Sequence, residues 1–525
     1  MARPRWGKPP DMAQETPWWR HAVVYEVYPR SYADSNGDGE GDLAGLRARL
    51  PHLLALGVDA LWLTPFYPSP LADGGYDVAD YRDVDPRFGS LADFDALVRD
   101  AHDAGLRVIV DIVPNHTSDQ HPWFLEALAA PPGSAARDRY LFRPGRPGGG
   151  PPNDWPSTFG GPAWQQVPDG EWYLHLYAPE QPDLNWRNPQ VRREFERILR
   201  FWLDRGVDGF RIDVAGGLFK DPALTDLGPN PPGDVMYDHP EVHELYRDWR
   251  RVLDSYGGDR MAIGEVWADE PDALARFLHP DELHQVFQFD LQLAPWSAAA
   301  FRQVVTDCLQ ATAPYGAAPT WVLSSHDAVR HRTRYDDPPG TGLARARAAL
   351  LMVLALPGSA YLYQGEELGL PEVLDLPDEA RQDPVWLHGG GERPGRDGCR
   401  VPLPWSGSAP PYGFSPEDAR PWLPMPPGWA ELTVAAQRAD PGSTLSYYRQ
   451  ALRLRRELLP ELPETMDWLE APDTVLAFGR GPLVCVVNCG TEPVPLPLGE
   501  PLLTSGPLTG GLVPPDTAAW LRLPV

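Results

Sequence analysis

The chain has 525 residues and a formal net charge of −27, and 42% of its residues are apolar. This length is too great for one small domain, and the apolar content excludes an intrinsically disordered chain. The acidic balance disfavours nucleic acid and anionic membrane surfaces as partners, because both repel a negatively charged protein at long range. A neutral small molecule matches this composition better as a ligand.

The cysteines and the N-terminus bear on the compartment. Cys308, Cys399, Cys485 and Cys489 form no C-x-x-C pair, so neither a zinc site nor a dense disulfide framework is predicted. The charged N-terminus has no apolar run behind it, and no stretch reaches the roughly 18 apolar residues of a membrane span. We therefore expect a soluble cytoplasmic protein without a membrane partner, and its oligomeric state is left open.

Strand-like and helix-like segments alternate along most of the chain. A strand over 23–28 and a leucine-rich helix over 43–56 come first, and a second strand follows at 60–64. Further strands are predicted at 108–113, 210–214, 262–266, 286–291, 321–323 and 360–363, with amphipathic segments such as 191–203 between them. Eight parallel βα units close into a (β/α)8 TIM barrel, an α/β fold whose catalytic residues lie at the C-terminal strand ends. An open doubly wound sheet is the alternative, but no G-x-G-x-x-G follows the first strand.

The loop after the first strand carries oxygen ligands at alternate positions, as calcium loops do. A complete EF-hand needs a glutamate at the twelfth position, where this chain has Gly45, so an EF-hand is excluded. A solvated acidic turn is the alternative to a structural Ca²⁺ or Mg²⁺ site. The expected ligands are the side chains of four residues and the backbone carbonyl of a fifth: Asp34, Asn36, Asp38 and Asp42, with Glu40 through its carbonyl.

Two parts of the chain depart from the βα alternation. The connection 117–185 is rich in Gly, Pro and Trp, and loops of this length are usually lids or small subdomains, so we predict an inserted subdomain over the barrel mouth. After a helix near 445–458, short alternating runs are typical of an antiparallel β-sandwich. The predicted domains are a catalytic barrel over 1–116 and 186–458, the inserted subdomain over 117–185, and a C-terminal β domain over 459–525.

Charged side chains stand near the ends of several predicted strands. Arg211 and Asp213 are two residues apart, so in a strand they point to the same side. The guanidinium favours the ionised form of Asp213, which could then act as a nucleophile, although an isolated R-x-D is more often a structural ion pair. Three other predicted strand ends also carry acidic residues or histidines, which favours a catalytic role for Asp213 over a structural ion pair. They are Asp111-Ile-Val-Pro-Asn-His116, Gly264-Glu265-Val-Trp267 and Ser325-His326-Asp327.

Together, these four segments resemble the motifs of the α-amylase superfamily, glycoside hydrolase family 13. Within it, Gln181-Pro-Asp-Leu-Asn185 resembles the insert motif of the α-glucosidase and oligo-1,6-glucosidase branch, and the likeness covers about the first 460 residues. The resemblance implies a nucleophile, Asp213, a general acid and base, Glu265, and a third carboxylate that orients the sugar, Asp327. It also implies that His116 and His326 bind sugar hydroxyls.

The neighbours of Glu265 agree with the acid role. Val266 and Trp267 are apolar, and a desolvated carboxyl resists ionisation. A retaining glycosidase needs one ionised and one protonated carboxyl about 5 Å apart on opposite sides of the anomeric carbon.

The resemblance also describes the far end of the sugar. In similar α-glucosidases, an aspartate after the second strand and the second arginine of a loop after the eighth hold the terminal 4-hydroxyl. Carried over, Asp77 and Arg400 would close the pocket, so that single glucoses leave from non-reducing ends. Tyr76 is expected to stack on the sugar and Phe159 to line the same pocket, with core packing as the alternative for both.

Two positions depart from the family pattern. Gly216 stands where relatives commonly carry histidine or asparagine, and Ser325 stands where asparagine usually precedes His-Asp. The missing side chain at Gly216 should enlarge the side that binds the leaving group or acceptor, which favours transglucosylation. Val214 follows the nucleophile as in enzymes for α-1,6 linkages, but one methyl group is worth only about 1–3 kcal/mol.

The sequence therefore predicts a retaining exo-acting α-glucosidase for maltose-type oligosaccharides or sucrose, with transglucosylation and no catalytic cofactor. An α-1,6-specific oligo-glucosidase and a sucrose- or trehalose-isomerising transferase are alternatives within the enzyme class. A catalytically inactive amylase-like scaffold is disfavoured, because all three acids are present.

Overall fold

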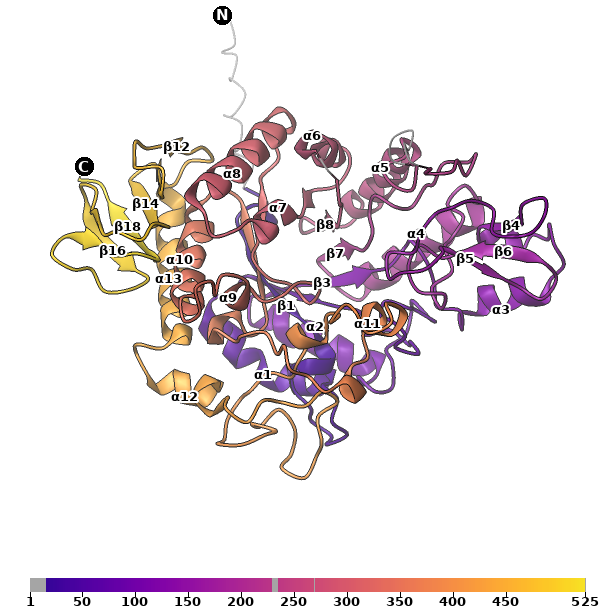
Figure 1. Cartoon of the computed structure of the whole chain (residues 1–525), viewed down its shortest axis with the longest axis horizontal. Coiled ribbons are helices and arrows are strands. Elements are labelled where there is room, and N and C mark those ends of the chain that lie inside the picture. The colour runs from indigo at the N-terminus through magenta and orange to yellow at the C-terminus, as the bar shows by residue number, and fades with distance from the viewer. Residues whose placement is uncertain (1–15, 229–234, 269, 525) are drawn as a thin grey trace, which may run out of the picture.

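The computed structural model describes residues 16–228, 235–268 and 270–524. Its centre is a parallel eight-stranded sheet with the strand order β10-β11-β1-β2-β3-β7-β8-β9. A parallel bridge between Gln288 and Trp321 joins the two ends, so the sheet closes into the predicted (β/α)8 barrel (Figure 1). The strands are β1 Val23–Val27, β2 Ala60–Leu63, β3 Arg107–Ile112, β7 Gly209–Ile212, β8 Met261–Gly264, β9 Gln285–Val286, β10 Thr320–Val322 and β11 Ser359–Tyr363.

Alternate residues of these strands belong to two apolar clusters. Trp62, Ile109 and Ile263 pack in an inner cluster, whereas Leu61 and Val108 belong to the main core that the helices cover. Both faces of each strand are thus buried, which explains the nearly continuous apolar runs in the sequence. The helices of the barrel layer are α1 Leu43–Leu56, α2 Leu91–Asp103, α4 Pro189–Asp204, α5 Glu241–Asp254, α8 Ala298–Thr312, α10 Gly342–Ala355 and α13 Thr444–Leu458.

One predicted strand is wrong. The run 286–291 holds only the end of β9, and the short helix α7 Phe289–Leu293 follows it. Its apolar spacing fits both a strand and a short buried helix, which periodicity alone does not separate. Other short helices lie in the connections: α6 Pro271–Ala275, α9 His331–Arg334, α11 Pro384–His388 and α12 Val434–Ala439.

The segment between β3 and α4 forms a small unit of its own. It contains α3 Pro122–Ala129 and an antiparallel sheet of β4 Phe142–Pro144, β6 Glu171–Leu174 and β5 Trp164–Gln166. Trp155, Trp164 and Leu174 form part of its separate apolar cluster. This unit and the C-terminal sheet lie at opposite ends of the long axis (Figure 1).

The C-terminal residues form two antiparallel layers, as predicted for a β-sandwich. The larger sheet consists of β12 Asp467–Trp468, β13 Val475–Arg480, β14 Leu483–Asn488, β18 Thr517–Arg522 and β16 Glu500–Thr504. The smaller consists of β15 Val494–Pro495 and β17 Leu512–Val513. One face of the larger sheet packs on the barrel, where the Trp520 indole donates a hydrogen bond to the Leu351 carbonyl at 2.9 Å. The other face packs with Val513 of the smaller sheet.

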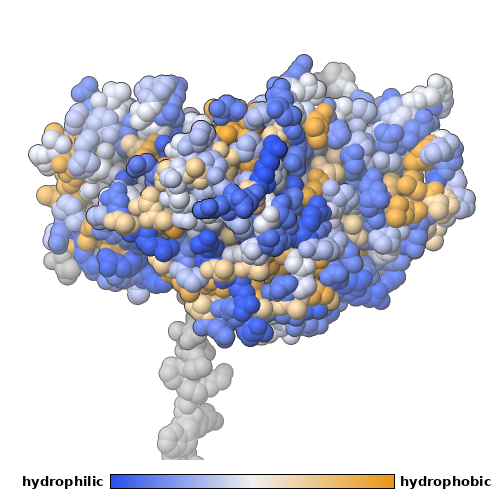
Figure 2. All heavy atoms as spheres, turned by 90° about the horizontal axis from the view of Figure 1, so that it is seen from below, coloured by the Kyte–Doolittle hydropathy of each residue, from blue (hydrophilic) through white to orange (hydrophobic). Residues whose placement is uncertain are grey.

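The face shown in Figure 2 is mostly hydrophilic, and the cysteines are unpaired. Figure 2 shows a face on which hydrophilic residues predominate and hydrophobic ones lie in separate small groups. In the described ranges, no helix has both the length and the apolar character needed to cross a bilayer. All four cysteines are free thiols.

Candidate active site

The predicted acids meet at the C-terminal end of the barrel strands. Asp213 directly follows β7, Glu265 directly follows β8, and Asp327 lies a few residues beyond β10. Asp111 lies within β3, beside β7 in the sheet. The parallel strands therefore deliver one carboxyl each to the same mouth.

Arg211 holds three of these carboxyls together. Its Nη1 donates to Asp111 Oδ1 at 3.0 Å and to Asp213 Oδ1 at 2.6 Å, and its Nη2 lies 2.8 Å from Glu265 Oε2. The Asp213 and Glu265 carboxyls thus contact neighbouring nitrogens of one guanidinium. This places them close enough to act on a single glycosidic oxygen, as the separation of about 5 Å in retaining enzymes requires.

The titration of Asp213 differs from the expectation based on Arg211 alone. Burial raises the pKa of Asp213 well above its ordinary value; Arg211 opposes this, and the neighbouring Glu265 and Asp111 add to it. Burial likewise raises the pKa of Asp111 to about 6. Asp213 and Asp111 are buried beside one shared guanidinium, so both carboxyls hold their protons more strongly than an exposed aspartate does. The R-x-D motif shows the cation but not the two additional acids that compete for it.

Glu265 has polar partners as well as apolar neighbours. Its Oε2 accepts the Val214 N–H at 3.0 Å, and its Oε1 accepts the Trp267 indole N–H at 3.1 Å. Val214 adopts the left-handed conformation, with φ at 47°, in the turn that carries its N–H to Glu265. The sequence therefore predicted only part of the environment of Glu265, since it indicated the apolar neighbours but not these two hydrogen-bond donors.

A separate polar group fixes Asp327. The Nε2 of His326 lies 3.0 Å from Asp327 Oδ2, and its Nδ1 lies 2.5 Å from Glu26 Oε1. Burial alone would lower the pKa of His326, but Asp327 and Glu26 raise it to about 9. Burial opposes ionisation of Asp327, yet His326 and the nearby arginines hold its pKa well below the ordinary value. Asp327 is thus the ionised acid of the site at neutral pH.

The arginines beside Asp327 are arranged differently from the prediction. Arg396 Nη1 donates to Asp327 Oδ1 at 2.9 Å, while its Nη2 and Nε contact Asp73 and Asp383 at 2.5 Å each. Arg400 Nη2 also donates to Asp327 Oδ1, at 2.9 Å. Arg396 and Asp73 were not selected from the sequence, although both belong to the motifs that supplied Arg400 and Asp77.

Asp77 does not form the expected pair with Arg400 in the described structure. Its two carboxylate oxygens accept the backbone N–H groups of Ala72 and Asp73, each at 2.9 Å. Burial raises the pKa of Asp77 to about 6. Its carboxylate therefore orders the turn that presents Asp73, and Asp73 is the residue that reaches an arginine.

The remaining predicted sugar contacts come from the β2 loop and the inserted segment. The Tyr76 ring stacks on His326 with centroids 5.2 Å apart, and its hydroxyl donates to Asp111 Oδ2 at 3.0 Å. Gln181 Nε2 lies 3.0 Å from His116 Nε2. Phe159 lies under Arg396, whose guanidinium carbon is 5.2 Å from its ring centroid. The inserted segment therefore contacts His116 through Gln181 and Arg396 through Phe159.

Gly216 has room for a side chain. A Cβ added there would meet Val266 Cγ1 at 3.6 Å and nothing nearer. Its backbone is not left-handed, so no strain opposes a substitution.

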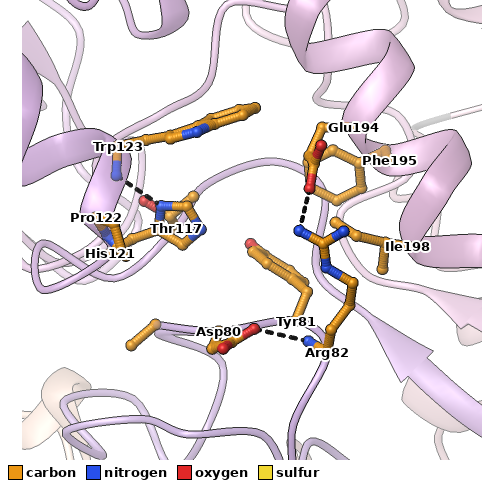
Figure 3. A pocket seen from close by; sticks show the side chains of 11 residues that line it. Asp80, Tyr81, Arg82, Thr117, His121, Pro122, Trp123, Glu194, Phe195 and Ile198 are labelled. Atoms are coloured by element: carbon orange, nitrogen blue, oxygen red, sulfur yellow. Dashed lines mark hydrogen bonds and ion pairs between the residues drawn. The ribbon is translucent and has the colours of Figure 1, made fainter. Parts of the chain in front are cut away.

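A cavity of about 90 Å³ opens beside Glu265 and Asp327. It is lined by Trp62, Arg211, Glu265, Trp267, Phe287, Phe289, Gln292, Leu293, Val322, Ser325, His326, Asp327 and Ala328. A larger cavity, of about 210 Å³, lies between the loop around Tyr81, the start of α3 and α4 (Figure 3). It contains the Arg82–Glu194 ion pair but none of the three predicted catalytic acids, so the smaller cavity belongs to the reaction site.

The predicted cation loop is ordered by its own backbone. Asp34 accepts the N–H groups of Gly37 and Gly39 at 2.7 and 2.9 Å, and Asp42 accepts that of Gly45. Within the described ranges, no group of three or more His, Cys, Asp or Glu side chains is arranged to hold a metal ion. The oxygen-only donor set still suits a hard cation, which stays a prediction.

Comparisons with known proteins point in one direction. The family model described as alpha amylase, catalytic domain, matches residues 26–462. A probable alpha-glucosidase of Rhizobium meliloti is 40% identical over 92% of both chains, and an oligo-1,6-glucosidase of Parageobacillus thermoglucosidasius is 38% identical over 84% of both. The crystal structure of an alpha-glucosyl transfer enzyme matches with a TM-score of 0.88 and 38% identity, over 97% of this chain and 100% of the other.

Proposed function

The chain belongs to the α-amylase catalytic-domain family, and on that premise we propose that it is a retaining α-glucosidase that releases single glucoses from non-reducing ends of short α-glucosides. The observation that carries this proposal is the shared contact of Asp213 and Glu265 with one guanidinium. Two carboxyls so close leave no room for a water molecule between the second carboxylate and the anomeric carbon, which an inverting enzyme needs.

The reaction proceeds through two displacements. Asp213, ionised when its proton is shared toward Glu265, attacks the anomeric carbon, and Glu265 protonates the departing oxygen. A water molecule or another hydroxyl then gives its proton to Glu265 and attacks the same carbon, which frees Asp213. Asp327, held ionised by His326 and the arginines, accepts sugar hydroxyls and orients the ring.

Exo action is supported by the charges at the far end of the pocket. Arg396 joins Asp73, Asp327 and Asp383, and Phe159 of the inserted segment covers this arginine. A second sugar beyond the terminal hydroxyls would have to break these ion pairs. The ion pair of Arg396 with Asp73 favours these two residues for the terminal 4-hydroxyl over the predicted Asp77 and Arg400.

The first test uses nitrophenyl α-glucoside. We expect the chain to release nitrophenol, with glucose first appearing as the α-anomer by NMR, and Asp213→Asn to reduce release by at least about 10³-fold. Asp238→Asn is a control, because Asp238 is a partly exposed acid outside the carboxyl cluster. First formation of the β-anomer would overturn the retaining mechanism. The relative rates of hydrolysis of maltose, isomaltose and sucrose then show which glycosidic linkage the enzyme prefers.

Transfer to hydroxyls other than water is a second proposed activity, favoured by the open space at Gly216. A histidine there would narrow the side on which acceptors approach. We expect Gly216→His to lower the ratio of transfer products to free glucose several-fold. Gly216→Ala is the control, since it removes the conformational freedom of glycine but leaves the acceptor side unobstructed. An unchanged ratio in Gly216→His would exclude this role.

We also propose a reducing, cytoplasmic location, supported by four free thiols of which three are buried. Oligosaccharides and hydroxyl acceptors are the proposed partners, and a structural Ca²⁺ or Mg²⁺ in the loop of Asp34 is the proposed ion.

A further inference from the structure

The larger cavity, drawn in Figure 3, lies where the inserted segment joins the barrel. Tyr81 and Arg82 come from the loop after β2, Trp123 comes from α3, and Glu194 comes from α4. The cavity has a volume of about 210 Å³, against about 90 Å³ for the reaction cavity. Because the smaller cavity belongs to a site for a sugar ring, the larger one has room for a ligand of the same size.

An aromatic side chain forms one wall of this cavity. Trp123 is half-buried, and Arg139 lies over its ring with the guanidinium carbon 5.0 Å from the centroid, which holds the indole in place. Tyr81 and Phe195, whose ring centroids are 5.2 Å apart, line the cavity with further apolar surface. The C–H face of a pyranose is apolar, so stacking it on an indole favourably removes apolar surface from water.

Hydrogen-bond donors lie across the cavity from the indole and beside it. Figure 3 shows the Arg82–Glu194 pair opposite Trp123, with Nη2 of Arg82 2.5 Å from Oε1 of Glu194. The Arg82 side chain is 45% exposed, so its other N–H groups can donate to a ligand. His121 Nδ1 accepts the Trp123 backbone N–H at 3.1 Å, so the neutral ring carries its proton on Nε2, which has no partner among the described residues. These donors match the hydroxyl groups around the edge of a sugar ring.

The charges of the lining residues favour a neutral ligand. Arg82 neutralises Glu194, whose other carboxylate oxygen accepts Arg197 Nη1 at 3.3 Å. Burial lowers the pKa of His121 to about 4, so this ring is uncharged at neutral pH. Among the described lining residues, Asp80 is therefore the one charge without an ion pair. An anion would be repelled by Asp80, and a hard metal ion would find only this one free carboxylate.

We propose that this cavity is a second binding site, separate from the reaction site, for a neutral pyranose held between the Trp123 indole and the Arg82 guanidinium. The cavity contains none of the three predicted catalytic acids, so the inference goes beyond the proposed function, and only the choice of glucose as a probe rests on that function. The Tyr81 hydroxyl donates to the carbonyls of Val113 and His116, at 2.8 and 2.7 Å. A sugar bound here would thus contact a tyrosine that is hydrogen-bonded to the segment carrying His116.

The test is fluorine NMR of the full chain labelled with fluorotryptophan. The resonances of Trp123 and Trp267 are assigned from Trp123→Phe and Trp267→Phe, and glucose is then titrated into the labelled protein. We expect a saturable shift at Trp123, which reports the second site, and another at Trp267, which lines the reaction cavity. Sorbitol, an open-chain polyol without a ring to stack, should leave the Trp123 resonance unmoved.

Arg82→Ala removes the donors opposite Trp123 and should raise the glucose Kd measured at Trp123 about tenfold, with no change at Trp267. Arg197→Ala is the matched control, because Arg197 contacts the same glutamate but is 67% exposed and is not among the described lining residues, so neither Kd should change. The inference is overturned if glucose leaves Trp123 unmoved, if sorbitol shifts it equally, or if Arg82→Ala keeps the original Kd. No turnover of any α-glucoside, together with no glucose response at Trp267, would overturn the proposed function instead.

Discussion

At the scale of single residues, the contacts of Arg211 show which part of the site the R-x-D spacing predicted and which part it could not predict. The two-residue spacing correctly indicated that Arg211 and Asp213 face the same side, since the ion pair is 2.6 Å long. It could not show that Asp111 and Glu265 reach the same guanidinium from other strands. Those contacts depend on strand neighbours far apart in the chain. Burial raises the pKa of Asp213 despite Arg211, and Glu265 and Asp111 add to that rise.

Arg396 is the residue whose replacement tests the closed end of the pocket. Lysine keeps the charge but presents one ammonium, so it cannot contact Asp73, Asp327 and Asp383 together. We expect Arg396→Lys to lower kcat/KM for maltose by about 10²-fold, chiefly through KM, as measured by initial rates. Arg456→Lys, a change at an exposed pair with Asp59, should leave both constants unchanged. Unaltered KM in Arg396→Lys would remove Arg396 from the sugar contacts.

At the scale of elements, the sequence predicted long periodic segments better than short ones. The helix over 43–56 coincides with α1, and Asp42 caps it by accepting the Gly45 N–H. Half of the strand predicted over 286–291 is the start of α7, because a few apolar residues satisfy either period. Arg396 and Arg400 lie in one tight turn, and only tertiary contacts show that Arg396 is the one that reaches Asp73.

The loop of Asp34 provides a prediction at this scale. If it binds a hard cation, Ca²⁺ added after treatment with EDTA should raise Tm by roughly 1–3 °C, because ligand binding stabilises only the folded state. Asp38→Ala should abolish the shift, since it removes a proposed ligand. Asp440→Ala is a control in another exposed turn, where Asp440 accepts the Gly442 N–H. An identical Tm with EDTA and with Ca²⁺ would leave the acidic turn as the correct interpretation.

At the scale of the whole molecule, the C-terminal sheet and the barrel share one apolar core. Trp520 and Cys485 belong to the same cluster as Leu351 of α10. We therefore expect a single calorimetric unfolding transition, and Trp520→Ala should lower the free energy of unfolding by about 3–5 kcal/mol through the cavity it leaves. Two transitions, with only one sensitive to Trp520→Ala, would show instead that the sheet unfolds independently. Trp468→Ala, at a half-buried position of β12, should cost less.

The way the barrel closes determines where its sheet opens most easily. Between β9 and β10 the strands meet through the bridge of Gln288 with Trp321, while neighbouring strand pairs share longer ladders. This seam borders the reaction cavity, which Phe287, Phe289 and Val322 help to line. Where fewer interstrand bonds resist opening, local breathing costs least. We therefore expect local opening to be easiest along this seam, away from the β3–β7–β8 strands that hold the acids.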